Sequence, residues 1–431
     1  MDSLPEDPAA DARELMDAVR SDDAPRVRRL FQDRPALRGR VNDPIGPFDS
    51  PPLTSARSRE VMDALLDAGA DLDAKSRWWA GGFGFLHIAP PELAAYALER
   101  GATVDIHAAA RLGLLDRLRT LVEGDPTLVH ARGGDGQTPL HFARTVEVAA
   151  LLLDQGADLD AIDVDHESTP AQYMTDHRHE VARYLVERGA KTDILMAAAL
   201  GDVDRVRAFL DADPGSWRTR GNARFFPMTD RRSGGTIYQW TLGPDASAYQ
   251  AAARFGRTEV LRLLMDRGPA GPTLIAACRL HDDETVAALI ASDPGLAGRL
   301  SDDDRSEIAN AARDNDDEAV SLMLRVGLPA DARGQHGGTP LHWAAYHGNL
   351  EMTRALLAHD PPLEDVENDF KSRPIGWATH GSEDGWHKAT GDYPGVVDAL
   401  LAAGARPFDE PRGTEAVKAV QRRYGAKGPS S

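Results

Sequence analysis

Three carboxylates and one imidazole gather in the short segment Asp163-Val164-Asp165-His166-Glu167-Ser168. Such a group could bind a cation or set a general acid beside a general base. Acidic residues ahead of a Thr-Pro pair also cap the next helix and fix its turn. Because neither a calcium-loop spacing nor a His-Glu-x-x-His pattern occurs here, we predict a solvated turn without a metal. If the chain is an enzyme, Asp165, His166 and Glu167 are its acid–base candidates.

A long insertion, residues 217–246, joins two helix-forming stretches. Residues 224–229 and 236–242 alternate with period two around the turn signal Ser233-Gly234-Gly235, which predicts a β-hairpin. We call residues 223–241 the arm. Loops of this length are uncommon unless functional or disordered, although surface insertions are also tolerated. The arm's candidate binding residues are Phe225, Phe226, Arg231, Arg232, Tyr238 and Trp240.

Two smaller segments also carry aromatic residues in unusual places. Trp78 and Trp79 are adjacent in a glycine-rich tip, so at most one is expected to be buried and the other is a candidate binding residue; alternatively, both fill space beside the short helix at Pro90. Residues 381–391 form a second insertion, and we expect its Trp386 to plug the end of the core.

Charge and composition exclude several classes of protein. The chain has 431 residues with 49 basic and 68 acidic side chains, so its formal net charge of −19 repels nucleic acid and anionic membranes. No stretch approaches about 18 consecutive apolar residues, and the acidic N-terminus lacks the apolar core of a secretory signal. The single cysteine, Cys278, excludes an intramolecular disulfide framework. We therefore expect a soluble cytoplasmic protein without a cofactor and without a nucleic-acid or membrane partner.

These segments are positioned by a repeat that runs along the chain. Its clearest copy begins at Gly338-Thr339-Pro340-Leu341-His342, and Thr138-Pro139-Leu140-His141 repeats the pattern. Thr caps a first helix, Pro fits its first turn, and small residues allow close helix packing. A Leu pair fills the core from the second helix, and Gly ends it in a left-handed conformation. One such helix pair cannot cover its own apolar faces, so the copies must stack.

With these motifs and the closing Gly-Ala-Asp-Leu-Asp runs at 69–73 and 156–160, the chain resembles ankyrin-repeat proteins of the bacterial type. The resemblance implies an all-α solenoid of about twelve degenerate helix–turn–helix units with short β-hairpin connections. We expect one continuous solenoid over 12–409, preceded by a disordered N-terminus (1–11). A C-terminal capping helix (410–424) and a loose tail (425–431) would follow.

In such a solenoid the concave surface is formed by the hairpin tips and the ends of the first helices. The resemblance places on it Arg111, Arg254, Phe255, Arg279, Arg313, His336, Tyr346 and His347. Several arginines on one surface of an acidic chain suggest a partner with an acidic patch. The buried positions of the repeat include His141 and His342, which we expect to hydrogen-bond within the stack.

Three functions fit these features. The first is a cytoplasmic scaffold that binds a partner protein through its concave groove and the arm. The second is an enzyme or small-molecule receptor in which the arm closes over an anionic or aromatic ligand. Its non-hydrolytic chemistry, such as isomerisation or cyclisation, would use Asp165, His166, Glu167, Arg231 and Tyr238. The third is an inhibitory role against a basic partner. A closed pocket of about 300 Å³ beneath the arm would favour the second function.

Overall fold

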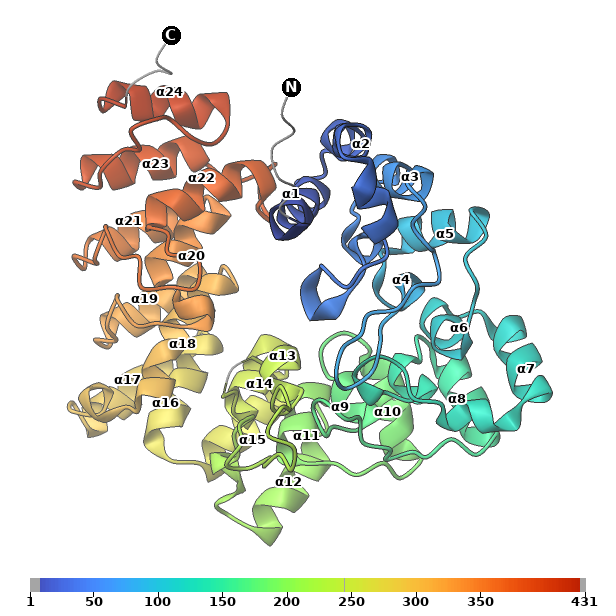
Figure 1. The fold of residues 1–431 in the computed structure, drawn as a ribbon. Helices are drawn as coiled ribbons and strands as arrows, with labels where there is room; N and C mark the ends of the chain where they lie inside the picture. Colours follow the sequence, from blue (N-terminus) through green and yellow to red (C-terminus); the bar gives the residue numbers. More distant parts are fainter. Residues whose placement is uncertain (1–7, 244, 427–431) are drawn as a thin grey trace. The chain divides into compact units, whose positions relative to one another are not determined.

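The computed structural model describes residues 8–243 and 245–426, and they form short helices that follow one another in pairs (Figure 1). No β-strand forms over these two ranges, and the tips contribute isolated bridges such as Lys75 with Gly84. The helical repeat predicted from the sequence is confirmed. Within the same ranges, no helix is long and apolar enough to cross a membrane.

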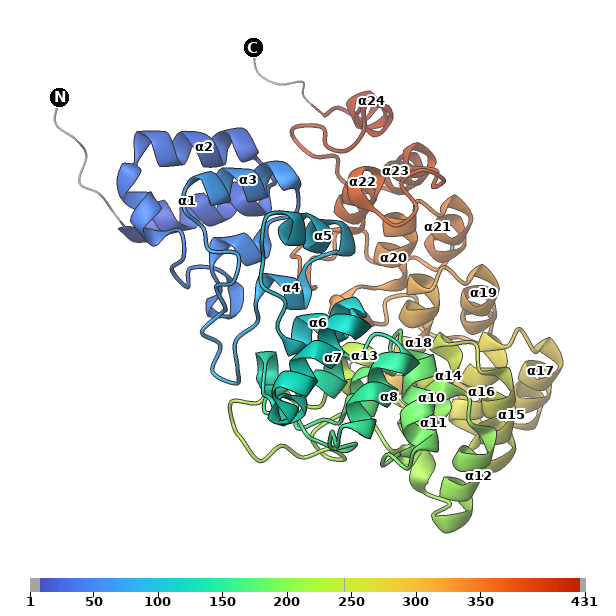
Figure 2. The ribbon, with the colours of Figure 1, turned by 90° about the vertical axis from the view of Figure 1, so that its right-hand side faces the viewer.

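The chain divides into two compact units. Unit 1 comprises residues 1–192 and 222–241, and unit 2 comprises residues 193–221 and 242–431. The arm therefore belongs to unit 1, although the helices on either side of it belong to unit 2. Figure 2 shows α1, α2 and α3 packed together at the start of unit 1.

Unit 1 contains ten α-helices of the repeats and one turn of helix in the arm among its described residues. They are α1 (Pro8–Arg20), α2 (Ala24–Asp33), α3 (Arg59–Asp67), α4 (Phe85–Ile88), α5 (Pro91–Glu99), α6 (Ile106–Leu112), α7 (Leu115–Gly124), α8 (Val146–Asp154), α9 (Pro170–Tyr173), α10 (His179–Glu187) and α13 (Tyr238–Thr241). Short 3₁₀ turns complete the repeats: η1 (Pro35–Arg40), η2 (Pro47–Asp49), η3 (Pro52–Ser55), η4 (Pro126–His130), η5 (Gly134–Gly136) and η6 (Pro139–Phe142).

Unit 2 continues the same pattern, and Figure 1 shows its helices α20 to α24 following one another in a stack. Its α-helices are α11 (Ile194–Leu200), α12 (Val203–Ala212), α14 (Ala248–Arg254), α15 (Thr258–Arg267), α16 (Ala270–Arg279), α17 (Asp283–Ser292), α18 (Asp302–Arg313), α19 (Asp317–Arg325), α20 (Pro340–His347), α21 (Leu350–Leu357), α22 (Pro374–Asp384), α23 (Tyr393–Ala402) and α24 (Glu415–Arg423). Its 3₁₀ turns are η7 (Ser216–Arg218), η8 (Ala297–Arg299) and η9 (Gln335–Gly337).

The Thr-Pro-Leu-His motif positions its helix by local hydrogen bonds. The Nδ1 atom of His141 accepts the backbone N–H of Thr138 at 3.1 Å, and His342 accepts that of Thr339 at 3.2 Å. On the other side of the ring, His141 Nε2 donates to the carbonyl of Ser168 in the next tip. Burial lowers the pKa of His141 to about 3, so this imidazole is neutral. Both histidines are therefore structural, as predicted.

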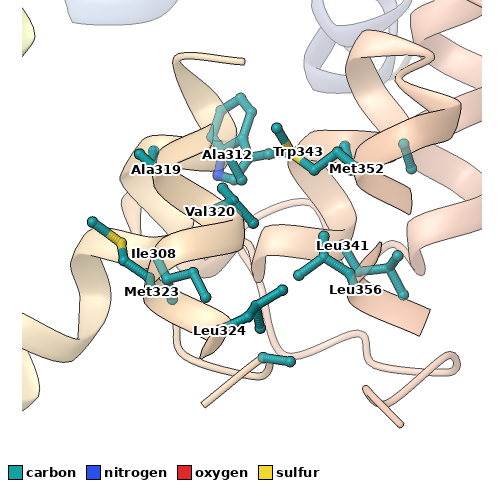
Figure 3. Packing of buried hydrophobic residues seen from close by; sticks show 14 of the residues in the cluster. Ile308, Ala312, Ala319, Val320, Met323, Leu324, Leu341, Trp343, Met352 and Leu356 are labelled. Carbon is teal, nitrogen blue, oxygen red and sulfur yellow. The ribbon is translucent and has the colours of Figure 1, made fainter. Parts of the chain in front are cut away.

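Apolar residues from successive helices form the core between the layers. In unit 2, Ile308 of α18, Val320 of α19, Leu341 of α20 and Leu356 of α21 are all buried in one cluster (Figure 3). Cys278 lies in the same cluster, and burial raises the pKa of its thiol to about 12. The thiol is therefore unreactive.

Two expectations about element boundaries need correction. Helix α1 begins at Pro8, so residues 8–11 are helical and only residues 1–7 of the expected disordered terminus lie outside the described residues. Helix α22 extends to Asp384 and thereby includes the first residues of the predicted insertion 381–391. The predicted capping helix is α24, while most of the expected tail, residues 427–431, lies outside the described part of the chain.

Candidate functional site

The arm does not form the predicted β-hairpin. Its described residues make an irregular loop that ends in the single helical turn α13, with no strand. The reason lies in the hydrogen-bond partners of its backbone N–H groups. The N–H groups of Asp230, Gly234 and Ile237 bond to side chains of Glu167, Asp165 and Ser168, so they are not available to a second strand.

The acidic segment 163–168 is thus the anchor of the arm. One carboxylate oxygen of Glu167 accepts the backbone N–H and the hydroxyl of Thr229, both at 2.7 Å, and the N–H of Asp230 at 2.9 Å. Burial alone would raise the pKa of Glu167, but these hydrogen bonds outweigh it and lower the pKa. Glu167 is therefore held as an acceptor rather than poised to exchange a proton.

The aromatic residues of the arm pack inward. The Tyr238 ring is completely buried, and the half-buried ring of Phe226 meets it edge-on at 5.2 Å. The two rings thus pack against each other in the interior, where the receptor hypothesis placed a closed pocket. Trp240, in contrast, is 69% exposed, and Arg231 is also exposed.

The predicted Trp78–Trp79 tip also meets the arm. Both indoles are half-buried, which matches neither the alternative with one exposed ring nor the alternative in which both rings fill space beside Pro90. Trp78 packs edge-on against Phe48 at 5.1 Å, and the Arg232 guanidinium lies 4.2 Å above the Trp79 ring. The same tip also contacts the repeat tip that contains Gly133. A Cβ at Gly81 would lie 2.1 Å from the carbonyl oxygen of Gly133, so this contact requires glycine.

Beneath the arm, acidic groups from two successive tips meet one histidine. Asp163 accepts the N–H groups of His166 and Ser168 and the hydroxyl of Tyr173, which identifies it as a structural turn residue. Asp135, from η5, comes close to Asp165 and His166. Burial raises the pKa of Asp135 to about 7, the Asp165 charge adds to this rise, and His166 opposes it.

In unit 2, the predicted groove arginines lie together but are matched by acids. Arg254, Arg279 and Arg313 line a cavity of about 330 Å³ together with acidic residues of α18. Asp314 pairs with both Arg279 and Arg313, and Asp316 lies 3.6 Å from Arg279. Arg313 also donates to Gln335 at 2.5 Å. A partner's acidic patch would have to displace these internal carboxylates.

Phe255, half-buried, lies 5.5 Å below the Arg254 guanidinium.

A larger hollow of about 700 Å³ lies over α20 and α22, and we call it the aromatic groove. Its floor contains the buried rings of Trp343 and Trp377, which meet edge-on at 5.0 Å. Phe370 and Trp386 stand at its side with 60% and 65% of their surface exposed. Further lining residues are His336, Tyr346, Lys371, Arg373, His380, Glu383, Phe408 and Arg412.

Trp386 does not plug the end of the core, as the sequence had suggested. Its ring stacks at 6.1 Å on Trp343 and meets Tyr346 edge-on at 5.2 Å, so it extends the aromatic surface outward. Trp386 follows the end of α22 at Asp384, and 65% of its surface is exposed.

The remaining predicted groove residues divide between surface and interior. His336 and Tyr346 line the aromatic groove. His347 is buried, donating from Nε2 to the carbonyl of Arg313 at 2.7 Å. Arg111 donates to the carbonyls of Leu86 and Ala89 in unit 1 and so ties neighbouring repeats together.

Sequence reasoning missed Asp135, Phe370 and Trp377. Asp135 precedes Asp165 by about one repeat, so equivalent tip positions were the available signal. For Phe370 and Trp377 the available signal was a pair of aromatic residues close in sequence, Phe370 in a repeat tip and Trp377 in the first helix that follows it.

Comparison with known proteins agrees with this architecture. A sequence model of ankyrin repeats matches residues 106–196, 274–366 and 308–408, which together make up just over half of the chain. The E3 ubiquitin-protein ligase XB3 of Oryza sativa subsp. japonica is 40% identical over 85 residues, which are 20% of this chain and 19% of that protein. The Drosophila melanogaster palmitoyltransferase Hip14 is 27% identical over 126 residues, or 29% of this chain and 18% of that protein.

Among solved structures, the human ASB11 ankyrin repeat domain is 18% identical and matches with a TM-score of 0.27. The match covers 71% of this chain and all of that domain. The chain spans about a fifth or less of the curated relatives that it matches.

Proposed function

The chain belongs to the ankyrin-repeat family, and from this premise we propose that it binds a partner protein in the aromatic groove of unit 2. Ankyrin repeats are generally protein–protein interaction modules. The proposal names the part of the repeat surface on which the partner lies and the side chains that it contacts.

The observation that carries the proposal is the exposure of Phe370 and Trp386 beside a buried aromatic floor. Large rings exposed together around a hollow are characteristic of interaction sites, because covering them removes apolar surface from water. Tryptophan in the centre of such a surface often contributes most of the binding free energy. Trp386, stacked on Trp343, has the packing that would hold it in place for a partner.

The charges around the groove indicate how the partner is oriented. Lys371 and Arg412 stand with Glu383 among its lining residues, so the rim offers both signs of charge. We propose that the partner inserts an apolar or aromatic side chain between Phe370 and Trp386 and meets the rim with polar groups, as in protein interfaces generally. The net charge of −19 would favour a partner with a basic surface.

We do not propose the arm as the principal clamp. Its backbone donors and the Tyr238 ring are engaged with unit 1, so a partner would have to detach it before contacting those groups. Trp240 stays outside this packing and gives a matched control for Trp386, because the two indoles have similar exposure, 69% and 65%.

The test is affinity capture with the full chain as bait from cells of its source, followed by a binding titration with the captured protein. Trp386→Ser should weaken binding by about 30-fold or more, the cost of losing a hot-spot residue. Trp240→Ser should leave it unchanged. Equal binding by both variants, or a loss confined to Trp240→Ser, would reject the aromatic groove as the site.

A further inference from the structure

One cluster of polar side chains in unit 1 has no part in the proposed binding of a protein. Asp135, Asp165 and His166 each direct one ligand atom into a common space, with all three atoms within 4.8 Å of one another. Ligands held at about 2.0–2.2 Å from one ion lie at most about 4.4 Å apart. Small side-chain rotations are therefore enough to bring these three atoms onto one ion.

The hydrogen bonds of His166 fix which of its nitrogens faces the carboxylates. Nδ1 lies 2.7 Å from the carbonyl oxygen of Gly235, and because a carbonyl can only accept, Nδ1 carries the hydrogen. In the neutral imidazole, Nε2 then offers a lone pair. It hydrogen-bonds to no described residue, and the nearest carboxylate oxygen, that of Asp165, lies 3.7 Å away.

The His166 side chain is 10% exposed and that of Asp165 8%. The cluster thus places Nε2 of a nine-tenths-buried histidine next to two carboxylates, 3.7 Å from the oxygen of Asp165 and beyond hydrogen-bond distance. When both carboxyls are ionised and the imidazole is neutral, all three groups are acceptors, and the space between them favours a cation. An imidazole anchored through Nδ1 to a carbonyl is also the arrangement that orients histidine as a metal ligand.

In a second cluster of unit 1, a histidine and a carboxylate hydrogen-bond directly to each other. His87 Nδ1 accepts the N–H of Gly84, so Nε2 carries the hydrogen and donates to Asp105 at 2.9 Å. Asp105 also accepts from Lys75 and from the backbone of Ala108. His87 and Asp105 therefore satisfy each other there without an ion.

We propose that Asp135, Asp165 and His166 bind a divalent transition-metal ion such as Zn²⁺ between the two repeat tips and the arm. Nitrogen ligation by His166 selects this class over Mg²⁺ and Ca²⁺, which prefer all-oxygen sites. The remaining carboxylates nearby, Asp163 and Glu167, are engaged with backbone and hydroxyl donors.

The ion would fasten the arm to the repeats. Asp135 and Asp165 belong to successive tips, and the N–H of Val164 already donates to the carbonyl of Asp135 at 2.8 Å. His166 holds the arm at Gly235, and a Cβ added at Gly234 would lie 2.9 Å from its ring. A metal bond to His166 Nε2 would therefore hold the ring, and with it residues 233–237, in place.

The experiment uses the full chain, stripped with a chelator and dialysed, and titrated with Zn²⁺ by calorimetry. Asp135→Asn is the test variant because Asn tolerates the left-handed backbone found there, with φ of 52°. It keeps the backbone carbonyl that meets Val164. His281→Ala is the control, because His281 is an accessible imidazole 2.8 Å from Asp316 and 3.3 Å from Glu318.

Wild type should bind one Zn²⁺ per chain, and Asp135→Asn should weaken that binding by about 100-fold or more. His281→Ala should bind as wild type does. Hydrogen exchange at residues 233–237 should slow on Zn²⁺ addition in wild type only, and circular dichroism should show Asp135→Asn folded. The proposal is overturned if wild type binds no Zn²⁺, if Asp135→Asn binds it equally well, or if His281→Ala abolishes binding.

Discussion

The repeat tips of unit 1 and the aromatic groove of unit 2 are built from the same repeat but differ in what covers them. In unit 1, the arm lies over segment 163–168 and buries Tyr238 and most of the polar groups of that segment. In unit 2, Phe370 and Trp386 remain exposed over a hollow of about 700 Å³. Segment 163–168 is thus covered by its own chain, whereas the aromatic groove is open.

This difference shows how an insertion can change the role of a repeat surface. The arm bonds to Glu167, Asp165 and Ser168 of the tip beneath it, so that part of unit 1 gains stability and is closed to a partner protein. No such segment lies over the aromatic groove in the described residues. The comparison predicts that substitutions in the arm change stability, whereas substitutions at the groove change binding.

The largest effect is expected from truncating the buried ring of the arm. Tyr238→Ala leaves a cavity beside Phe226 and should lower the free energy of unfolding of unit 1 by about 3–5 kcal/mol. Trp386→Ala removes a ring that is 65% exposed and should lower the stability of unit 2 far less. Hydrogen exchange resolved by residue compares the two units; equal destabilisation by the two variants would refute the contrast.

The second effect concerns the arginines of unit 2. Arg279→Gln leaves Asp314 and Asp316 without a buried guanidinium and should cost about 3 kcal/mol. Arg231→Gln, on the exposed part of the arm, should leave stability unchanged. Denaturant unfolding of the two variants measures this. An Arg279→Gln protein as stable as wild type would return Arg279 to the list of candidate contact residues for an acidic partner.

A third prediction concerns acid stability. Burial lowers the pKa of His141 to about 3, whereas the unfolded side chain titrates near about 6.5. The stability that the neutral imidazole provides is therefore present above about pH 6.5 and is lost as the pH falls toward 3. By pH 5 this group should cost about 2 kcal/mol.

The measurement is the denaturant midpoint at pH 7 and pH 5 for wild type and His141→Asn. The variant keeps a polar group in the cap but cannot be protonated, so its midpoint should fall less between the two pH values. The same fall in both proteins would mean that other groups determine the acid sensitivity of unit 1.

The smallest effect is expected at the anchor of the arm. Glu167→Ala removes one acceptor shared by Thr229 and Asp230, while Tyr238 and Ile237 remain buried. The arm should open locally, with hydrogen exchange at residues 229–230 accelerated by about tenfold. Partner binding in the aromatic groove should not change. Exchange as slow as in wild type would show that the anchor lies elsewhere in the arm.

The helical repeat could be predicted from the sequence because the signals that define it are local. Thr138 and His141, or Thr339 and His342, are three residues apart and cap their own helix. The arm was misjudged because period-two alternation also arises in a loop whose side chains alternate between interior and surface. Its deciding contacts, such as Gly234 with Asp165, join residues 69 positions apart. Asp135 was missed for the same reason, because its neighbours Asp165 and His166 come from the next repeat tip.

Hydrogen exchange of the full chain with and without its bound partner tests the central claim most directly. The account predicts that protection appears at residues 366–386, which carry Phe370 and Trp386, and that residues 223–241 exchange as in the free protein. Protection confined to the arm, with residues 366–386 unchanged, would contradict the account and make the arm the binding element.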